Sequence, residues 1–255
     1  MIALLERLNG SLKARQIFDR YAPWAVIALA AFLRLWNLGY PAKLVFDETY
    51  YVKDAYSLWK FGHEVSWSSS EVKTFDPNQL LNSPEFVVHA PLGKWLIGLG
   101  MQVFGPSNPI GWRIVPALVG IASVWLVYKI ALEIFGSKRW ALLPAFLLAI
   151  DGQAIVISRT AILDGLVMFF VVLGFYFLVR AINSEQPSML LIVMVLVLGA
   201  GAGVKWSSAL FLAVFMLYYA WTKKRWTSLL YLPLAAVPYL LSWIGWFVTQ
   251  GWGYQ

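Results

Sequence analysis

The feature that most constrains this chain is a succession of long apolar stretches with few charges between them. Residues 189–221 contain a single charged side chain, Lys205. Apolar and aromatic residues make up 60% of the 255 residues and charged residues 13%, about half of the ~25% that soluble domains carry. This pattern excludes a soluble enzyme, a disordered chain and a nucleic-acid-binding domain. We predict an all-α polytopic membrane protein.

The number of membrane crossings follows from the lengths of the apolar stretches. A transmembrane helix needs about 20 mostly apolar residues. The stretch from Met189 to Trp221 is too long for one crossing, so we divide it near Lys205. About seven spans are then predicted, at residues 21–40, 110–132, 140–157, 161–182, 189–204, 207–222 and 228–249.

The distribution of basic residues predicts the orientation, because cytoplasmic loops of membrane proteins carry an excess of Lys and Arg. With the N-terminus inside, the whole net charge of +7 lies on the cytoplasmic side. Residues 1–20 would form a basic cytoplasmic tail, and the first span would be retained as an anchor rather than cleaved. We therefore expect a multi-pass plasma-membrane protein. The inside bases are Arg7, Lys13, Arg15, Arg20, Lys129, Lys138, Arg139, Arg180, Lys223, Lys224 and Arg225.

Most of the polar sequence lies in one predicted extracytoplasmic loop, residues 41–108. Two stretches in it have the spacing of amphipathic helices. Residues 47–60 place Tyr51 and other apolar side chains on one face, and residues 91–104 begin with Pro91 at a first helical turn. The second stretch is too short to cross a bilayer, so we expect it to lie at the outer interface. Chemistry is expected on this surface.

Adjacent carboxylates at Asp47 and Glu48 follow the first predicted span directly. Repulsion between them and partial desolvation favour proton acceptance by one, which would make it a general base. The structural alternative is that Asp47 caps the following helix and that Glu48 stabilises its positive end. Both interpretations stay open on spacing alone.

A second polar segment runs from His89 to Lys94. A helix N-terminus with free amide groups, a lysine and a histidine can bind an anion such as phosphate, and Gly93 allows close backbone approach. The alternative is that Lys94 extends toward lipid headgroups while His89 is an ordinary loop residue.

Further charges lie near the predicted outer ends of spans. Charges at membrane depth are costly, so they usually pair with each other or belong to a site. Arg159 could form a structural pair with Asp164 or Asp151, or it could serve a site, and the same two alternatives hold for Lys205. Arg34 is expected to pair with a neighbouring acid or a headgroup.

Metal and cofactor sites receive little support. The chain has no cysteine and only two histidines, so a divalent cation would need oxygen ligands from Asp47 and Glu48. We assign no metal site, and a divalent cation stays open as a cofactor without a ligand cluster that supports it. The alternating glycines of residues 199–203 indicate close helix packing, because no strand precedes them and no P-loop lysine follows.

Four short segments, taken in this order, resemble the N-terminal half of the protein O-mannosyltransferases, and the actinobacterial members are most similar. The His-to-Lys segment is the most discriminating, whereas the acidic pair is shared by many glycosyltransferases of the C-type fold. The resemblance extends along essentially the whole chain. The segments are residues 46–51 (FDETYY), 89–94 (HAPLGK), 158–164 (SRTAILD) and 204–207 (VKWS).

The resemblance implies a C-type glycosyltransferase that moves mannose, with inversion, from polyprenyl-phosphate-mannose to Ser or Thr hydroxyls of secreted polypeptides on the outer face. Asp47 is then the leading general base, and Glu48 orients the acceptor or tunes Asp47. Cationic groups would stabilise the departing phosphate. The candidates are His89, Lys94, Arg159 and Lys205, with Tyr51, Asp151, Asp164 and Arg34 in supporting roles.

Two features depart from that family. Ala90 stands where its members usually have Pro, and its members continue well beyond 255 residues. We therefore expect the chain to be an N-terminal portion that forms a single transmembrane module. The other functions considered are sugar transfer to a lipid or glycan acceptor, transport, and an inactive lipid-binding fragment. A transporter should show internal repeats, and the sequence has none.

Overall fold

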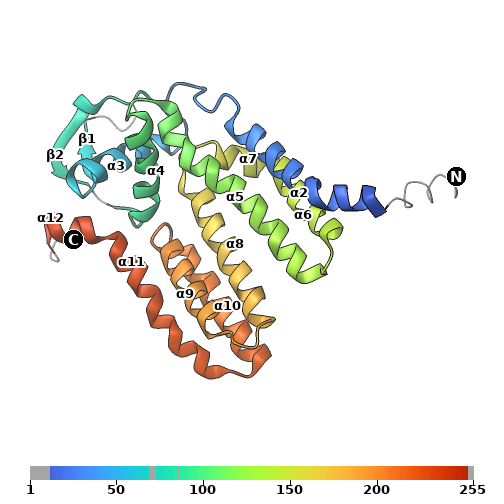
Figure 1. The fold of residues 1–255 in the computed structure, drawn as a ribbon. Coiled ribbons are helices and arrows are strands. Elements are labelled where there is room, and N and C mark those ends of the chain that lie inside the picture. The colour runs from blue at the N-terminus through green and yellow to red at the C-terminus, as the bar shows by residue number, and fades with distance from the viewer. Residues whose placement is uncertain (1–11, 69–72, 86, 252–255) are drawn as a thin grey trace.

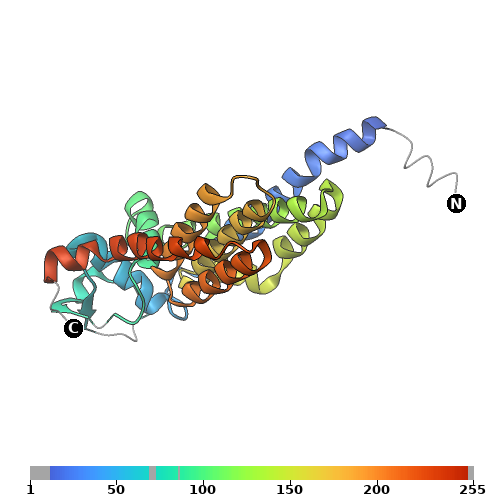
Figure 2. The same cartoon turned by 90° about the horizontal axis from the view of Figure 1, so that it is seen from below.

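The computed structural model describes residues 12–68, 73–85 and 87–251. Helices run the length of an elongated molecule, and a polar segment covers one end of it (Figures 1 and 2). The first helix, α2, covers Leu12–Leu35, so it begins well before the predicted span. Part of the predicted basic tail is therefore helical, and residues 1–11 lie outside the described residues.

Each predicted span is largely helical. The helices that follow the polar segment are α5 (Pro109–Phe135), α6 (Lys138–Ile150), α7 (Gly152–Ser158), α8 (Leu163–Ile182), α9 (Ser188–Ala202), α10 (Ser207–Lys223), η2 (Trp226–Ala235), α11 (Ala236–Ser242) and α12 (Ile244–Gln250). Local sequence explains several boundaries. Asn108 accepts a hydrogen bond from the Ile110 amide at the start of α5, where Pro109 is the first helical residue, and Gly136 ends that helix in the left-handed conformation.

The predicted count of seven spans is not confirmed. Among the described residues, α5 and α8 are long and apolar enough to cross a membrane as single helices. The count rises to four if each bent pair of helices is one span. One pair is α6 with α7, bent by 62°, and the other is η2–α11 with α12, bent by 53°. Helix α9 is apolar but has 15 residues, which is shorter than the usual crossing length.

The centre of the bundle is formed by α5 and α8, which pack against each other, while α9 packs on the other side of α8. The glycine run in α9 provides the close approach that the sequence predicts. A methyl group at Gly199 would collide with the Ala235 backbone, and one at Gly201 would collide with the Ser208 side chain. These glycines let the helices on either side lie against α9 without intervening side chains.

The polar segment contains the two predicted helices, α3 (Glu48–Phe61) and α4 (Leu92–Phe104). It also contains a small antiparallel sheet that the all-α prediction did not include. The sheet pairs β1 (Val65–Trp67) with β2 (Leu80–Pro84), and η1 (Pro77–Gln79) precedes β2. Because α3 packs on α4 and α4 packs on α5, the polar segment is fixed to the bundle.

Candidate active site

The two adjacent carboxylates follow a tight turn at the start of α3 and differ in burial. Phe46 has a φ of 50°, in the left-handed region, and its carbonyl accepts a hydrogen bond from the Thr49 hydroxyl at 3.0 Å. Glu48 is fully buried, whereas Asp47 is half-buried and lines a pocket. Asp47 makes no side-chain capping hydrogen bond to α3, so the capping alternative is wrong for this residue.

Glu48 is held by a buried ion pair that the sequence analysis did not identify. Its Oε1 lies 2.7 Å from Nε of Arg113 and its Oε2 lies 2.8 Å from Nη2. The amides of Ala161 and Val45 donate to the same carboxylate at 2.8 and 3.0 Å. Both oxygens are therefore occupied, and Glu48 ties α3 to α5 and to the turn before α8.

The same geometry tests whether Asp47 and Glu48 could bind a divalent cation together, which would need free oxygen atoms from both carboxylates. Glu48 already gives both oxygens to hydrogen bonds within the protein. The two adjacent residues therefore do not form a two-carboxylate ligand set. In the described ranges, no three His, Asp or Glu residues gather as metal ligands.

Lys94 forms a second buried charge cluster, at the start of α4. Its Nζ lies 2.9 Å from Oδ2 of Asp54 and 2.8 Å from Oε1 of Glu64, and the lysine is 2% exposed. The Trp246 indole donates to the other oxygen of Glu64. Burial lowers the pKa of Lys94, but the two carboxylates outweigh it and raise the pKa overall. Lys94 is therefore charged and bound within the protein rather than extended toward headgroups, as the alternative had it.

The pocket beside Asp47 lies between α3 and the segment that leads into α4, and its volume is about 260 Å³. Asp47, Tyr50, Tyr51, Asp54, Glu85, Val88 and Lys94 line it. Burial and the nearby carboxylates raise the pKa of Glu85 to about 7. Burial and Asp47 raise the pKa of Tyr51 to about 12. At neutral pH the pocket wall therefore holds a partly protonated carboxyl group, from Glu85, and a neutral phenol, from Tyr51.

His89 follows Val88 of the pocket wall, and Lys205 is close enough to His89 to affect its pKa. The His89 ring packs near Tyr51, with ring centroids 6.3 Å apart. Burial lowers the pKa of His89, and the positive charges of Lys205 and Lys94 lower it further. Lys205 forms a 2.9 Å ion pair with Asp164, and both side chains are partly exposed. The pairing of Asp164 with Arg159 that the sequence suggested is therefore wrong, because Asp164 pairs with Lys205.

Arg159 and Arg34 bind the ends of helices instead of acids. Arg159 Nη1 donates to the carbonyls of Leu33, Arg34 and Trp36, at 2.7–3.1 Å, near the end of α2. Arg34 donates in turn to the carbonyls of Leu148 and Ala149 near the end of α6. These contacts correct the expectation that Arg34 pairs with an acid or headgroup.

Asp151 also serves a helix end, since it accepts a hydrogen bond from the Ala154 amide at the start of α7. Unpaired helix carbonyls and amides are costly away from water, which explains why polar side chains gather at these ends. The two structural pairs suggested for Arg159, with Asp151 and with Asp164, are both absent among the described contacts.

The predicted site residues therefore divide into three groups. Tyr51 and Lys94 line the pocket with Asp47, and His89, Asp164 and Lys205 lie close to them. Glu48 is buried against Arg113, and Arg159, Arg34 and Asp151 hold helix ends. Sequence reasoning missed Arg113, Asp54, Glu64 and Glu85. One signal was available for Arg113, because it is a charge inside a predicted span, and another for Asp54, which follows Asp47 by two helical turns.

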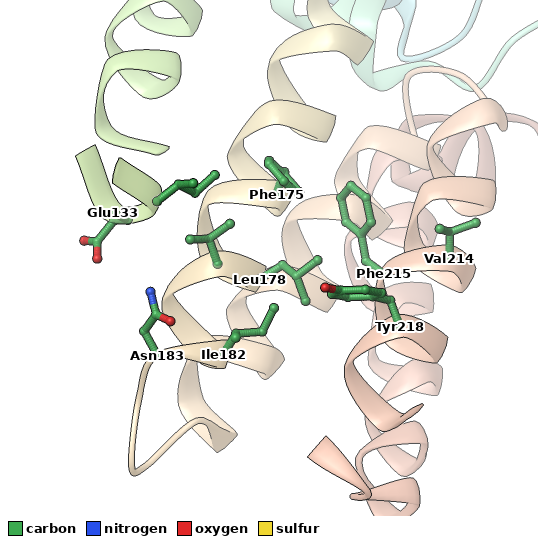
Figure 3. A pocket seen from close by; sticks show the side chains of 10 residues that line it. Glu133, Phe175, Leu178, Ile182, Asn183, Val214, Phe215 and Tyr218 are labelled. Carbon is green, nitrogen blue, oxygen red and sulfur yellow. The ribbon is translucent and has the colours of Figure 1, made fainter. Parts of the chain in front are cut away.

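A larger, apolar space lies at the opposite end of the bundle. It has a volume of about 480 Å³ and lies between the last turns of α5 and α8 and the middle of α10. Figure 3 shows Phe175, Leu178 and Phe215 around it, with the polar ends of Glu133 and Asn183 at one edge. A second space of about 370 Å³ shares Ile134, Phe175 and Phe215 with it. We call the two together the apolar groove.

Comparison with known proteins identifies protein mannosyltransferases among the relatives of this chain. Residues 88–249 match the family model described as dolichyl-phosphate-mannose-protein mannosyltransferase. A polyprenol-phosphate-mannose–protein mannosyltransferase of Mycolicibacterium smegmatis is 35% identical over 166 residues, which are 62% of this chain and 29% of the relative. The protein of the same name from Corynebacterium glutamicum is 28% identical over 91% of this chain and 52% of the relative. The chain thus spans about half the length of these relatives or less.

The fold also resembles that of an archaeal oligosaccharyltransferase. The archaeal oligosaccharyltransferase AglB from Archaeoglobus fulgidus, solved with an inhibitory peptide and a dolichol-phosphate, superposes with a TM-score of 0.52 at 18% identity. The match covers 92% of this chain and 35% of that one. The apo form of the oligosaccharyltransferase gives a TM-score of 0.53. The fold is therefore similar to that of the archaeal oligosaccharyltransferase.

Proposed function

This chain belongs to the dolichyl-phosphate-mannose-protein mannosyltransferase family, and from that premise we propose that it transfers mannose from a polyprenyl-phosphate-mannose donor to Ser or Thr hydroxyls of a polypeptide. The transfer would take place on the outer face of the plasma membrane, with the N-terminus in the cytoplasm. The observation that carries the proposal is the position of Asp47 in the wall of a pocket, while its neighbour Glu48 is buried in the interior.

In the proposed reaction, Asp47 accepts the proton of the acceptor hydroxyl as the hydroxyl oxygen attacks the anomeric carbon. The bond from that carbon to the phosphate oxygen breaks, and the phosphate leaves with the electron pair. Attack from the face opposite the phosphate inverts the anomeric carbon. Positioned proton transfer contributes about 10² to 10⁴ in rate, and cationic groups beside the departing oxygen add electrostatic stabilisation.

The geometry favours different roles for the four basic residues suggested for the phosphate. Lys94 and Arg159 already donate to carboxylates and to helix carbonyls, respectively. We therefore assign Lys94 and Arg159 a structural role around the pocket. His89 adjoins Val88 of the pocket wall, and Lys205, although paired with Asp164, is partly exposed and not buried like Lys94, so we place the donor phosphate beside these two. Glu48 and Arg113 act as positioning residues, because they fix the turn that carries Asp47.

The experiment is mannose transfer from polyprenyl-phosphate-mannose to a Ser/Thr peptide by the purified 255-residue chain in proteoliposomes. We expect wild-type protein to transfer mannose and Asp47→Asn to lose transfer. Glu185→Gln is the matched control, since Glu185 is an exposed carboxylate far along the chain. Equal transfer by the wild type and Asp47→Asn would contradict the assignment of the base.

Parallel assays separate the other functions. Transfer to a lipid or glycan acceptor, but not to the peptide, would show that the proposed donor is right and the proposed acceptor is wrong. Donor binding without transfer to any acceptor would indicate a lipid-binding fragment. Saturable flux of a solute into the same proteoliposomes would indicate a transporter.

A further inference from the structure

The pocket beside Asp47 has an unusual charge balance for a site next to a phosphate. Three carboxyl groups line it, from Asp47, Asp54 and Glu85, and one cation, Lys94. The Lys94 ammonium is bound to Asp54 at 2.9 Å and to a further carboxylate, Glu64, at 2.8 Å. The local sum is therefore negative, and a phosphate inside this pocket would face repulsion rather than a free cation.

The same groups suit a ligand that is rich in hydroxyls. An ionised carboxylate accepts hydrogen bonds through about four lone-pair positions, and the ion pair with Lys94 uses one of those of Asp54. A protonated carboxyl can also donate, and the raised pKa of Glu85 allows it to hold a proton near neutral pH. Acceptors and a donor thus face one space, as hydroxyl recognition requires.

The size and the aromatic wall favour one sugar ring. A volume of about 260 Å³ lies just below the ~300–1,000 Å³ of pockets for drug-sized ligands, so a prenyl chain cannot share the pocket with the sugar. Tyr50 is 51% exposed and lines the pocket with Tyr51. Aromatic faces provide apolar area with little loss of conformational entropy, which suits the C–H face of a pyranose.

We propose that this pocket is the subsite for the mannosyl group of the donor, with Asp54 and Glu85 binding ring hydroxyls and Tyr50 packing against the ring. The phosphate then lies outside the pocket, beside His89 and Lys205. The Lys94 cluster positions Asp54, and Trp246 extends that cluster to α12 through Glu64. This inference rests on the proposed function, because it assumes a donor that carries a sugar on a phosphate.

The test compares two short-chain lipids, polyprenyl phosphate and polyprenyl-phosphate-mannose, for binding to the purified chain. Glu85→Leu removes both hydrogen-bonding oxygens at similar volume. We expect it to weaken binding of the mannosyl lipid by about tenfold, equivalent to 1.4 kcal/mol, and to leave binding of the sugar-free lipid unchanged. Glu85→Gln should restore most of the affinity. His89→Ala is the contrasting variant and should weaken both lipids alike.

Tyr50→Ala serves as the second variant if Glu85→Leu does not fold, because Tyr50 is largely exposed and its loss leaves the core intact. It should also weaken only the mannosyl lipid. An equal loss for both lipids, or no loss for either, in a folded variant would overturn the subsite.

The two proposals can fail separately in these measurements. Selective binding of the mannosyl lipid without transfer would remove the proposed function and keep the subsite. Transfer by the wild type, with binding that Glu85→Leu and Tyr50→Ala do not change, would keep the function and remove the subsite. Failure of the folded wild type to bind either lipid would overturn both.

Discussion

The acidic pocket and the apolar groove lie at opposite ends of the same bundle and are built by different forces. Buried ion pairs with N–O distances of 2.7–2.9 Å fix the walls around the pocket. At the edge of the groove, an ion pair between Arg180 and Glu133 spans 3.8 Å between partly exposed side chains. Packing without directed bonds shapes the groove. The difference teaches that single substitutions should have large effects at the pocket and small effects at the groove.

The largest effect is expected at Asp47. Asp47→Asn keeps the size of the side chain and removes its ability to accept a proton. Mannose transfer should fall by about 10² to 10⁴, while the unfolding midpoint stays close to that of the wild type because Asp47 makes no capping bond to α3. Initial rates with saturating donor and peptide, together with thermal unfolding in detergent, would measure both quantities. A loss of less than tenfold would remove Asp47 from the chemistry.

The next effect concerns the Glu48–Arg113 ion pair. Arg113→Met leaves the buried Glu48 carboxylate without its cation, and removal of one partner of a buried pair costs about 3–5 kcal/mol. The double variant Glu48→Leu with Arg113→Met should recover part of that free energy of unfolding, because it removes the unpaired charge but leaves the backbone amides that Glu48 binds and the carbonyls that Arg113 binds without partners. Equilibrium unfolding of the four proteins forms a double-mutant cycle. An additive cycle would show that the pair is not coupled.

A smaller effect is expected from pH, through Glu85. Its pKa is about 7 because of burial first and then the negative charges of Asp54 and Glu64, against which Lys94 and Lys53 act. A carboxyl with a raised folded-state pKa stabilises the protein fully below its unfolded pKa of about 4.3. That contribution is lost as pH rises toward 7.

The measurement is the unfolding midpoint of wild type and Glu85→Gln between pH 4 and pH 8. The wild type should lose stability relative to the variant as pH increases across this window. A constant difference between the two proteins would show that Glu85 titrates at its ordinary pKa.

The smallest effect is expected in the groove. Tyr218→Phe removes one hydroxyl from a half-exposed side chain at the groove edge. We expect a change in the free energy of unfolding within about 0.5 kcal/mol and unchanged mannose transfer. A tenfold loss of transfer would contradict the contrast between the two ends and connect the groove to the reaction.

The pattern of apolar residues predicted much of the architecture. All seven predicted segments are largely helical, and α3 and α4 lie close to the predicted ranges. The small sheet was not predicted because β1 has three residues, too few for an alternating pattern to be recognised. The number of crossings is not confirmed, because α5 and α8 alone are long and apolar enough as single described helices, the two bent pairs count only if each is one span, and α9 has 15 residues.

Candidate residues were easier to find than their roles. The motifs around Asp47, His89, Lys94 and Lys205 all proved to lie near one pocket, since the folded chain brings the turns that carry them together. The ion-pair partners of the charged residues were harder to predict. Glu48 is 65 residues from Arg113, and Lys94 is 30 residues from Glu64. No periodicity connects such positions, so the sequence could not distinguish a cation bound to a carboxylate from one available to a phosphate.

By itself, the sequence determined the fold class, the position of the polar segment and the family, because apolar length and short motifs are properties of neighbouring residues. Only the tertiary structure decided which charged side chains are bound in ion pairs or hydrogen bonds within the protein. It paired Glu48 with Arg113 and left Asp47 at the pocket. Burial makes an unpaired charge costly, so packing between distant helices assigns each charged side chain to the frame or to the site.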